Sequence, residues 1–161
     1  MASKRIKVGM GEGVVVGAPS VISAEGLGSC VALTLYYSKR RMGGMAHIML
    51  PNSDWVKIPC TPYQCADRAL TTLLKELQSI GANIQDIVAK MVGGAQMFPF
   101  YNGGSSGIGE QNIMSIKYLL RKEQIPLVGS DVGGTHGRSL EFQLDSGRLI
   151  VMAIGREDRE I

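Results

Sequence analysis

The chain has 161 residues, 45% of them hydrophobic and 19% charged, and its 17 basic and 14 acidic side chains give a formal net charge of +3. This composition is typical of a globular protein, and the length predicts a single domain over residues 1–161 that buries its own core. The charge is too small and too scattered to predict binding to nucleic acid or to a membrane surface, and no apolar run is long enough to span a membrane.

The first half of the chain predicts short strands separated by glycine-rich turns. Strand-like apolar runs occupy residues 14–17 (VVVG), 30–37 (CVALTLYY) and 45–50 (MAHIML). The segment SKRRMGG between the last two runs is charged and ends in glycine, so we expect an antiparallel hairpin there.

This hairpin would bring a thiol and an imidazole onto neighbouring strands. A turn centred near Ser38 and Lys39 would set Cys30 directly opposite His47, with their Cβ atoms about 4.5–5.5 Å apart. A turn centred on residues 40–43 would shift the pairing by several residues and would still leave both side chains on adjacent strands.

Both residues have a structural and a catalytic interpretation. Cys30 is either the first buried residue of a strand or a nucleophile that a substrate reaches past the glycines at positions 26 and 28. His47 is either a hydrogen-bonded strand histidine or the base that a thiol with an ordinary pKa of about 8.5 requires. The only other histidine, His136, lies among glycines and is expected in a loop. Glu25 would disfavour a thiolate, so we expect its side chain to point away from Cys30.

The clearest helix follows a loop with the sequence NSDWVKIP. Apolar side chains recur at three- and four-residue steps through residues 61–81. Thr61 is the expected N-cap, with Pro62 at the first helical position and Gln64 completing a capping box. Gly81 suits the left-handed residue that follows a helix.

The remaining cysteines lie at the start of this helix. Cys60 and Cys65 belong to an odd set of three cysteines, and nothing in the sequence suggests secretion. We therefore expect them to pack as free thiols in a reducing cytoplasm rather than to form a disulfide, with a redox role as the weaker alternative. With two histidines elsewhere and no second cysteine pair, a zinc site is not expected.

The second half predicts further strands and one more helix. Residues 86–94 resemble a strand, and residues 103–112 predict a loop that opens a helix with its apolar face at Ile113, Ile116, Leu119 and Leu120. Strands are expected over residues 126–134, 138–147 and 148–155. Seven or eight strands with two clear helices predict an α/β (α+β-like) single-domain layered sandwich of mixed or antiparallel sheet.

Several motifs together resemble the chemoreceptor glutamine deamidase family, CheD. They are GLGSC at 26–30, GGMAHIMLP at 43–51, VGGAQMF at 92–98, IGEQN at 108–112, and DVGG with RS within 131–139. The resemblance implies a fold similar to that of deamidating bacterial toxins, with two to three helices flanking the sheet. It also implies a cytoplasmic enzyme without cofactor or metal that converts glutamines of methyl-accepting chemotaxis receptors to glutamate with release of ammonia. The phosphatase CheC is a further implied partner.

The same resemblance carries over two catalytic roles. Cys30 would be the nucleophile of a thioester mechanism and His47 its base, while backbone N–H groups around Gly28 and Ser29 would shape the site and stabilise an oxyanion. Family members have a threonine six residues before the cysteine, where this chain has Ala24. The group that orients His47 is therefore not identified from the sequence.

Two other interpretations remain open at this point. A non-catalytic adaptor that binds chemoreceptors or CheC would explain the loss of the threonine. A cysteine peptidase would use similar groups, but it needs an extended backbone in its cleft rather than a side-chain amide.

Overall fold

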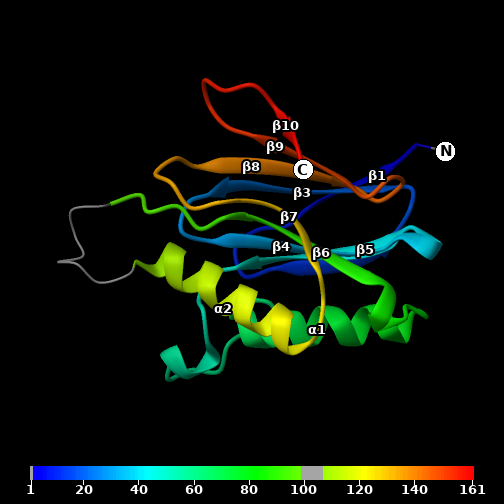
Figure 1. The fold of residues 1–161 in the computed structure, drawn as a ribbon, viewed down its shortest axis with the longest axis horizontal. Coiled ribbons are helices and arrows are strands. Elements are labelled where there is room, and N and C mark those ends of the chain that lie inside the picture. The colour runs from blue at the N-terminus through cyan, green and yellow to red at the C-terminus, as the bar shows by residue number, and fades with distance from the viewer. Residues whose placement is uncertain (1, 99–106) are drawn as a thin grey trace.

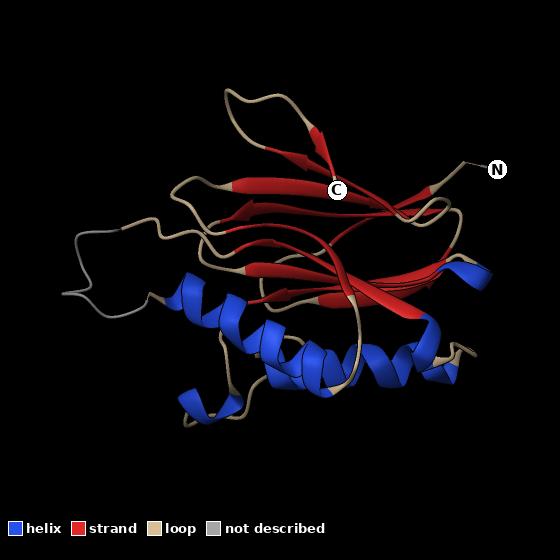
Figure 2. Ribbon diagram, viewed as in Figure 1, coloured by secondary structure: helices blue, strands red, loops and turns tan. Residues whose placement is uncertain are grey.

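The computed structural model describes residues 2–98 and 107–161, which form three layers: two stacked β-sheets and a layer of helices (Figures 1 and 2). One sheet has the order β1-β3-β8-β9-β10 and the other the order β2-β5-β4-β6-β7. Both helices lie on the outer face of the second sheet (Figure 2). This mixed α/β arrangement confirms the predicted layered sandwich.

The sheet farther from the helices is mostly antiparallel. β1 pairs with β3 in parallel, while β3, β8, β9 and β10 pair antiparallel in turn. Its strands are β1 (Lys4–Lys7), β3 (Ser20–Leu27), β8 (Arg138–Gln143), β9 (Arg148–Met152) and β10 (Arg159–Glu160). The sequence did not predict β1, β3 or β10. β1 and β10 are short and largely charged, so they lack the apolar run by which a strand is recognised.

The sheet next to the helices carries the predicted hairpin at its centre. β4 pairs antiparallel with both β5 and β6, and β6 pairs in parallel with β7. The strands are β2 (Gly13–Gly17), β5 (Met42–Ile48), β4 (Val31–Tyr37), β6 (Ile87–Gly93) and β7 (Leu127–Val132). Almost every residue of β4 and β5 is buried because this sheet is covered on both faces.

The two helices present the apolar faces that their periodicity predicts. α1 (Ala66–Ser79) buries Leu70, Leu73 and Leu77 among others, and α2 (Ile108–Lys122) buries Ile116 and Leu120. Short 3₁₀ helices cover Ser38–Arg40, Ser53–Trp55 and Ile84–Asp86. The described helices do not include one with both the length and the apolar character to cross a membrane.

The predicted ends of the first helix are half right. Gly81 has φ = 97°, which confirms the left-handed residue after the helix. The predicted start at Thr61 and Pro62 is wrong, because α1 begins at Ala66 with Cys65 as its N-cap. Thr61 and Gln64 do bond to each other, through Gln64 N–H to the Thr61 carbonyl (3.3 Å), but they close a separate turn.

The expectation of three free thiols is also wrong, since Cys60 and Cys65 form a disulfide. This bridge closes the turn that precedes α1, and Cys65 pairs with Leu50 through an isolated parallel bridge. The sequence-based argument from the odd cysteine count fails because a short local bridge needs only two nearby thiols. Cys30 is the free cysteine.

Two hydrophobic cores lie on opposite faces of the β2-β5-β4-β6-β7 sheet. The helix-facing core contains Leu33, Ile48 and Leu73, while the core between the sheets contains Ile22, Met45 and Phe142. The side chains of β4 and β5 therefore alternate between two interiors rather than between an interior and solvent. Cys30 belongs to the core between the sheets.

Candidate active site

Residues 28–30 carry the chain from one sheet to the other. β3 ends at Leu27 and β4 begins at Val31, so the segment Gly28–Cys30 connects the two sheets where these inner strands end and begin. Just before it, the pairing of β3 with β8 shifts by one residue between Ala24 and Leu27. Gly26 lies in this bulge with φ = 64°, a conformation that favours glycine.

The pairing of β4 with β5 corrects the predicted register by two residues. Ala32, rather than Cys30, is the partner of His47. The four residues 38–41 connect the strands, so the hairpin turn is centred one residue later than expected. Side chains two residues apart in an extended chain share a face, so Cys30, the residue directly before β4, lies diagonally to His47 on the face toward the other sheet.

Both candidate catalytic side chains are buried. His47 is 1% exposed and Cys30 is 9% exposed, and Cys30 packs in the core between the sheets. The structure thus brings the two predicted residues to the same face of the sheet, His47 on β5 and Cys30 directly before β4, although not to directly opposed positions.

A backbone carbonyl orients the His47 ring. Nδ1 of His47 lies 3.3 Å from the carbonyl oxygen of Val8, and because a carbonyl only accepts, this contact places the ring proton on Nδ1. Nε2 is then the unprotonated nitrogen, and it has no hydrogen-bond partner among the described residues. A neutral imidazole in this tautomer is able to accept a proton at Nε2.

Main-chain hydrogen bonds fix Val8 and His47 relative to each other. Val8 N–H donates to the carbonyl of Ser23 on β3 (2.8 Å), which extends the β1–β3 pairing by one step. His47 N–H donates to the Glu12 carbonyl, and the His47 carbonyl accepts from Gly11 N–H, both at 2.9 Å. Ala24 is fully buried and has no side-chain group for hydrogen bonding, so the Val8 carbonyl is the described acceptor for Nδ1.

Burial keeps the pair neutral. Desolvation raises the pKa of the Cys30 thiol, and a hydrogen bond from its own backbone only partly opposes this effect. Desolvation also lowers the pKa of His47, against smaller opposing contributions from the Val8 carbonyl and Glu12. Glu25 is exposed and pairs with Lys7 at 2.7 Å, which agrees with the expectation that it points away from Cys30. A neutral thiol at Cys30 and a neutral imidazole at His47 follow from these directions.

The segment before β4 is held through three successive carbonyls. The carbonyl of Gly28 accepts from Ala95 N–H and that of Cys30 from Gly94 N–H, both at 2.8 Å. Between them, the Ser29 carbonyl accepts from Nδ2 of Asn112 at 3.0 Å. A Cβ at Gly28 would lie 3.2 Å from Cγ of Met97, a tight contact from which the Met97 side chain would have to shift.

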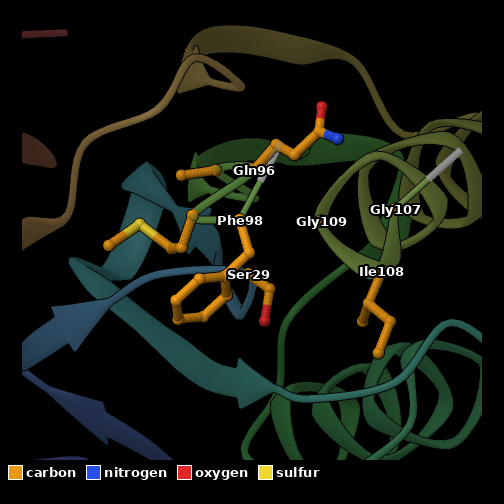
Figure 3. Close-up of a pocket in the computed structure, with 8 residues that line it drawn as sticks. Ser29, Gln96, Phe98, Gly107, Ile108 and Gly109 are labelled. Carbon is orange, nitrogen blue, oxygen red and sulfur yellow. The ribbon is translucent and has the colours of Figure 1, made fainter. Parts of the chain in front are cut away.

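An apolar pocket of about 540 Å³ opens beside Ser29. Figure 3 shows the side chains of Ser29 and Phe98 on one side of this pocket and Ile108, at the start of α2, on the other. Cys30 is not among the lining residues, so the pocket reaches the chain one residue before the thiol. A largely apolar groove next to a buried thiol suits a substrate side chain that approaches from a protein surface.

Some features of the site were not predicted. The role of Val8 is that of a main-chain carbonyl, which no side-chain pattern reveals. Asn112 did leave a signal, because it lies four residues before Ile116 and eight before Leu120 and so falls on the buried face of α2.

His136 lies in the loop between β7 and β8, as expected. Of the loop expected at 103–112, residues 103–106 lie outside the described residues, and α2 already begins at Ile108.

Comparison with known proteins gives a consistent result. Residues 49–153 match the family described as "CheD chemotactic sensory transduction". The "Chemoreceptor glutamine deamidase CheD" of Halalkalibacterium halodurans is 42% identical over 158 residues, covering 97% of this chain and 98% of that protein. The "Probable chemoreceptor glutamine deamidase CheD" of Caldanaerobacter subterraneus subsp. tengcongensis is 39% identical, covering 96% of each chain. Its namesake in Moorella thermoacetica is 41% identical, covering 95% of this chain and 93% of that protein.

Proposed function

The chain belongs to the CheD family, and from this membership we propose that it deamidates glutamine side chains of methyl-accepting chemotaxis receptors. The observation that carries the proposal is the Cys30–His47 arrangement. Cys30 directly precedes β4 and lies on the same face of the sheet as His47 of β5, and Nε2 of His47 is the ring nitrogen left without a partner among the described residues. The relatives named above are full-length matches, so the whole domain is the proposed enzyme.

In the first half of the reaction, Cys30 becomes acylated. Nε2 of His47 accepts the thiol proton as Sγ attacks the carboxamide carbon of the glutamine, and the carbonyl oxygen takes up the negative charge. Backbone N–H groups of the Gly28–Cys30 segment are proposed to stabilise that oxyanion, with Gly28 and Ser29 shaping the site. His47 then returns the proton to the amide nitrogen, the C–N bond breaks, and ammonia leaves a thioester on Cys30.

In the second half of the reaction, water hydrolyses the thioester by the same kinds of proton transfer. Nε2 of His47 takes a proton from water, the resulting hydroxide attacks the thioester carbon, and the C–S bond breaks. The proton on His47 returns to the departing Sγ, which restores the neutral pair. The net reaction converts one glutamine amide and one water to one glutamic acid and one ammonia, with no redox step.

The buried, neutral pair fits this use of His47 as a base at the moment of attack. Because burial raises the pKa of Cys30 and lowers that of His47, a preformed thiolate–imidazolium pair is disfavoured in the resting enzyme. Proton transfer concerted with attack avoids placing two charges in the core between the sheets.

The experiment compares receptor cytoplasmic domains incubated with the wild type, Cys30→Ala and His47→Asn. Asn is chosen because its amide N–H is able to donate to the Val8 carbonyl as Nδ1 does, while it supplies no base at the position of Nε2. We expect ammonia release and glutamine-to-glutamate conversion, read by peptide mass spectrometry, with the wild type alone. Conversion by Cys30→Ala would rule out the thiol mechanism, and cleavage of the receptor chain would identify a peptidase instead.

A non-catalytic adaptor is the second candidate, and Ala24 is the observation that favours it. An adaptor would bind chemoreceptors or CheC in the cytoplasm without converting any glutamine. In that case the wild type and Cys30→Ala would bind receptor domains equally, and neither would release ammonia. The Val8 carbonyl argues for the enzyme, because it gives Nδ1 the acceptor that Ala24 does not supply.

A further inference from the structure

α2 contributes a buried amide at a position where an apolar residue would be expected. Asn112 is fully buried, whereas Ile116 and Leu120 occupy the same face of the helix one and two turns later. An amide removed from water without full hydrogen bonding costs free energy. Oδ1 of Asn112 has no hydrogen-bond partner among the described residues, so part of that cost is not recovered.

The other end of the amide makes two hydrogen bonds. Nδ2 donates to the carbonyl of Ser29 at 3.0 Å and to the carbonyl of Met49 at 3.2 Å. Both partners are acceptors only, so the two N–H groups of one NH₂ are used and the orientation of the amide is fixed.

These two carbonyls lie close in sequence to the two members of the proposed catalytic pair. Ser29 is the residue before Cys30, and Met49 lies two residues after His47, directly after β5 ends at Ile48. Gly94 and Ala95 hold the flanking carbonyls of Cys30 and Gly28 by main-chain N–H groups, which any sequence could supply. The Ser29 carbonyl is held by a side chain, and the same side chain ties it to the strand that carries the base.

We propose that Asn112 is a positioning residue that holds Cys30 in alignment with His47. Its described hydrogen bonds go to two main-chain carbonyls, and it acts by fixing the spacing between the Gly28–Cys30 segment and the chain directly after β5. The inference rests on the proposed function in taking Cys30 and His47 as a working pair.

The first measurement is steady-state deamidation by Asn112→Ala, with Ser115→Ala as the matched control. Ser115 lies on α2 and donates to the Pro51 carbonyl at 2.6 Å, so it ties the same helix to the chain just beyond Met49 but not to Ser29. We expect kcat to fall between about tenfold and a hundredfold in Asn112→Ala, since small misplacements of reacting groups have effects of that size. KM should change little, and Ser115→Ala should keep both values.

The second measurement follows alkylation of Cys30 by iodoacetamide against pH and needs no receptor. In the wild type, neutral His47 assists the thiol, so the rate should be higher at neutral pH than in His47→Asn. The alkylation rate of Asn112→Ala should follow the same pH dependence as that of His47→Asn. The circular dichroism spectrum of Asn112→Ala should remain that of the wild type. If Asn112→Ala does not fold, Asn112→Ser is used with the same criteria.

An unchanged kcat in Asn112→Ala overturns the inference. A fall in kcat with a wild-type alkylation curve overturns it too, because the residue would then only support the fold. Coincident curves for the wild type and His47→Asn would mean that there is no working pair to align, which also overturns it. If the wild type converts no receptor glutamine, the proposed function fails, and the alkylation curves by themselves decide the role of Asn112.

Discussion

The ring of His47 occupies a place where burial and one hydrogen bond have opposite effects on its charge. Desolvation lowers its pKa from the ordinary value, and the contact with the Val8 carbonyl raises it by a smaller amount. The net result is a neutral ring with the proton on Nδ1. We propose that this single contact takes the place of the side-chain hydroxyl that Ala24 does not provide.

The pH dependence of deamidation follows from that balance. The proposed mechanism needs neutral His47, and the lowered pKa of this ring places the expected acidic limb of kcat/KM below about pH 6.5. The raised pKa of Cys30 leaves the thiol protonated through neutral pH, so no thiolate-dependent rise is expected there. Rates of receptor deamidation across pH test this expectation, with His136→Gln as the control that removes the other histidine. An acidic limb above pH 6.5, or one that disappears in the control, would contradict it.

The same shift affects stability with a defined sign. His47 has a lower pKa in the folded protein than in the unfolded chain, so between these two values the unfolded chain binds more protons. The free energy of unfolding should therefore fall as the pH falls through this window, and His47→Asn should lessen that fall. Urea titrations of both proteins at a series of pH values measure it.

At the scale of elements, the first turn of α2 lies against the chain that follows β6. A Cβ at Gly109 would lie 2.6 Å from the carbonyl oxygens of Ala95 and Gly94, closer than real Cβ atoms approach. Helix propensity alone would favour alanine by about 1 kcal/mol, so the two effects have opposite signs. Main-chain atoms do not yield as a flexible side chain does, and the clash is expected to dominate.

Gly109→Ala should therefore destabilise the protein by about 1–3 kcal/mol, the usual cost of forcing atoms into a packed interface. It should also lower kcat, because Ala95 N–H holds the carbonyl of Gly28 next to the site. Urea denaturation and receptor deamidation test the two effects. Met114→Ala, at an exposed position of the same helix, is the control and should leave both unchanged. A stabilised Gly109→Ala would show that α2 moves freely from the chain beneath it.

The turn before α1 is the second local device. The Cys60–Cys65 disulfide closes a very short loop, for which the entropy lost by the unfolded chain corresponds to roughly 2 kcal/mol. Reductant should lower the Tm of the wild type. The double variant Cys60→Ser, Cys65→Ser should have a Tm close to that of the reduced wild type, whether or not reductant is present. Cys30→Ala should respond to reductant as the wild type does. Thiol titration of the unfolded, unreduced protein should find Cys30 alone reactive, and three reactive thiols would contradict the bridge.

At the scale of the whole molecule, the β2-β5-β4-β6-β7 sheet is covered on both faces, by the helices on one side and by the other sheet on the other. Leu33 on β4 points to the helix layer and Cys30 and Ala32 to the other sheet, so the two cores share one set of strands. The helices should consequently not melt independently of the core that contains the proposed catalytic pair.

Leu73→Ala tests this coupling from the helix side. Leu73 is fully buried in the helix-facing core, so its truncation should cost about 2–5 kcal/mol. In denaturant, the loss of helix by circular dichroism and the exposure of Cys30 to an alkylating agent should shift to a lower midpoint together. Ile58→Ala, at a position that is 81% exposed, is the control and should shift neither. Helix loss that precedes exposure of Cys30 would show that the two cores unfold separately.

Local pattern alone predicted much of this molecule. The buried face of α1, the hairpin of β4 and β5 and the layered class of the fold all depend on spacing along the chain, which the sequence contains in full. The proposal that Cys30 and His47 form a catalytic pair starts from the same hairpin and from the motifs shared with the family. The exact register did not follow, because a shift of the turn by one residue moves every partner by two. The start of α1 was misplaced because Thr61 and Gln64 form a turn with capping chemistry outside a helix.

What the sequence by itself determined is which side chains are available: one thiol and one histidine on a predicted hairpin, and no threonine at position 24. Only the tertiary structure decided how they are held. The Val8 carbonyl reaches His47 because β1 lies beside β3. The amide of Asn112 reaches Ser29 and Met49 because α2 packs against the Gly28–Cys30 segment, where the chain passes from one sheet to the other. Main-chain acceptors are the same in every residue, so their use depends on where packing places them in space and leaves no mark on the sequence.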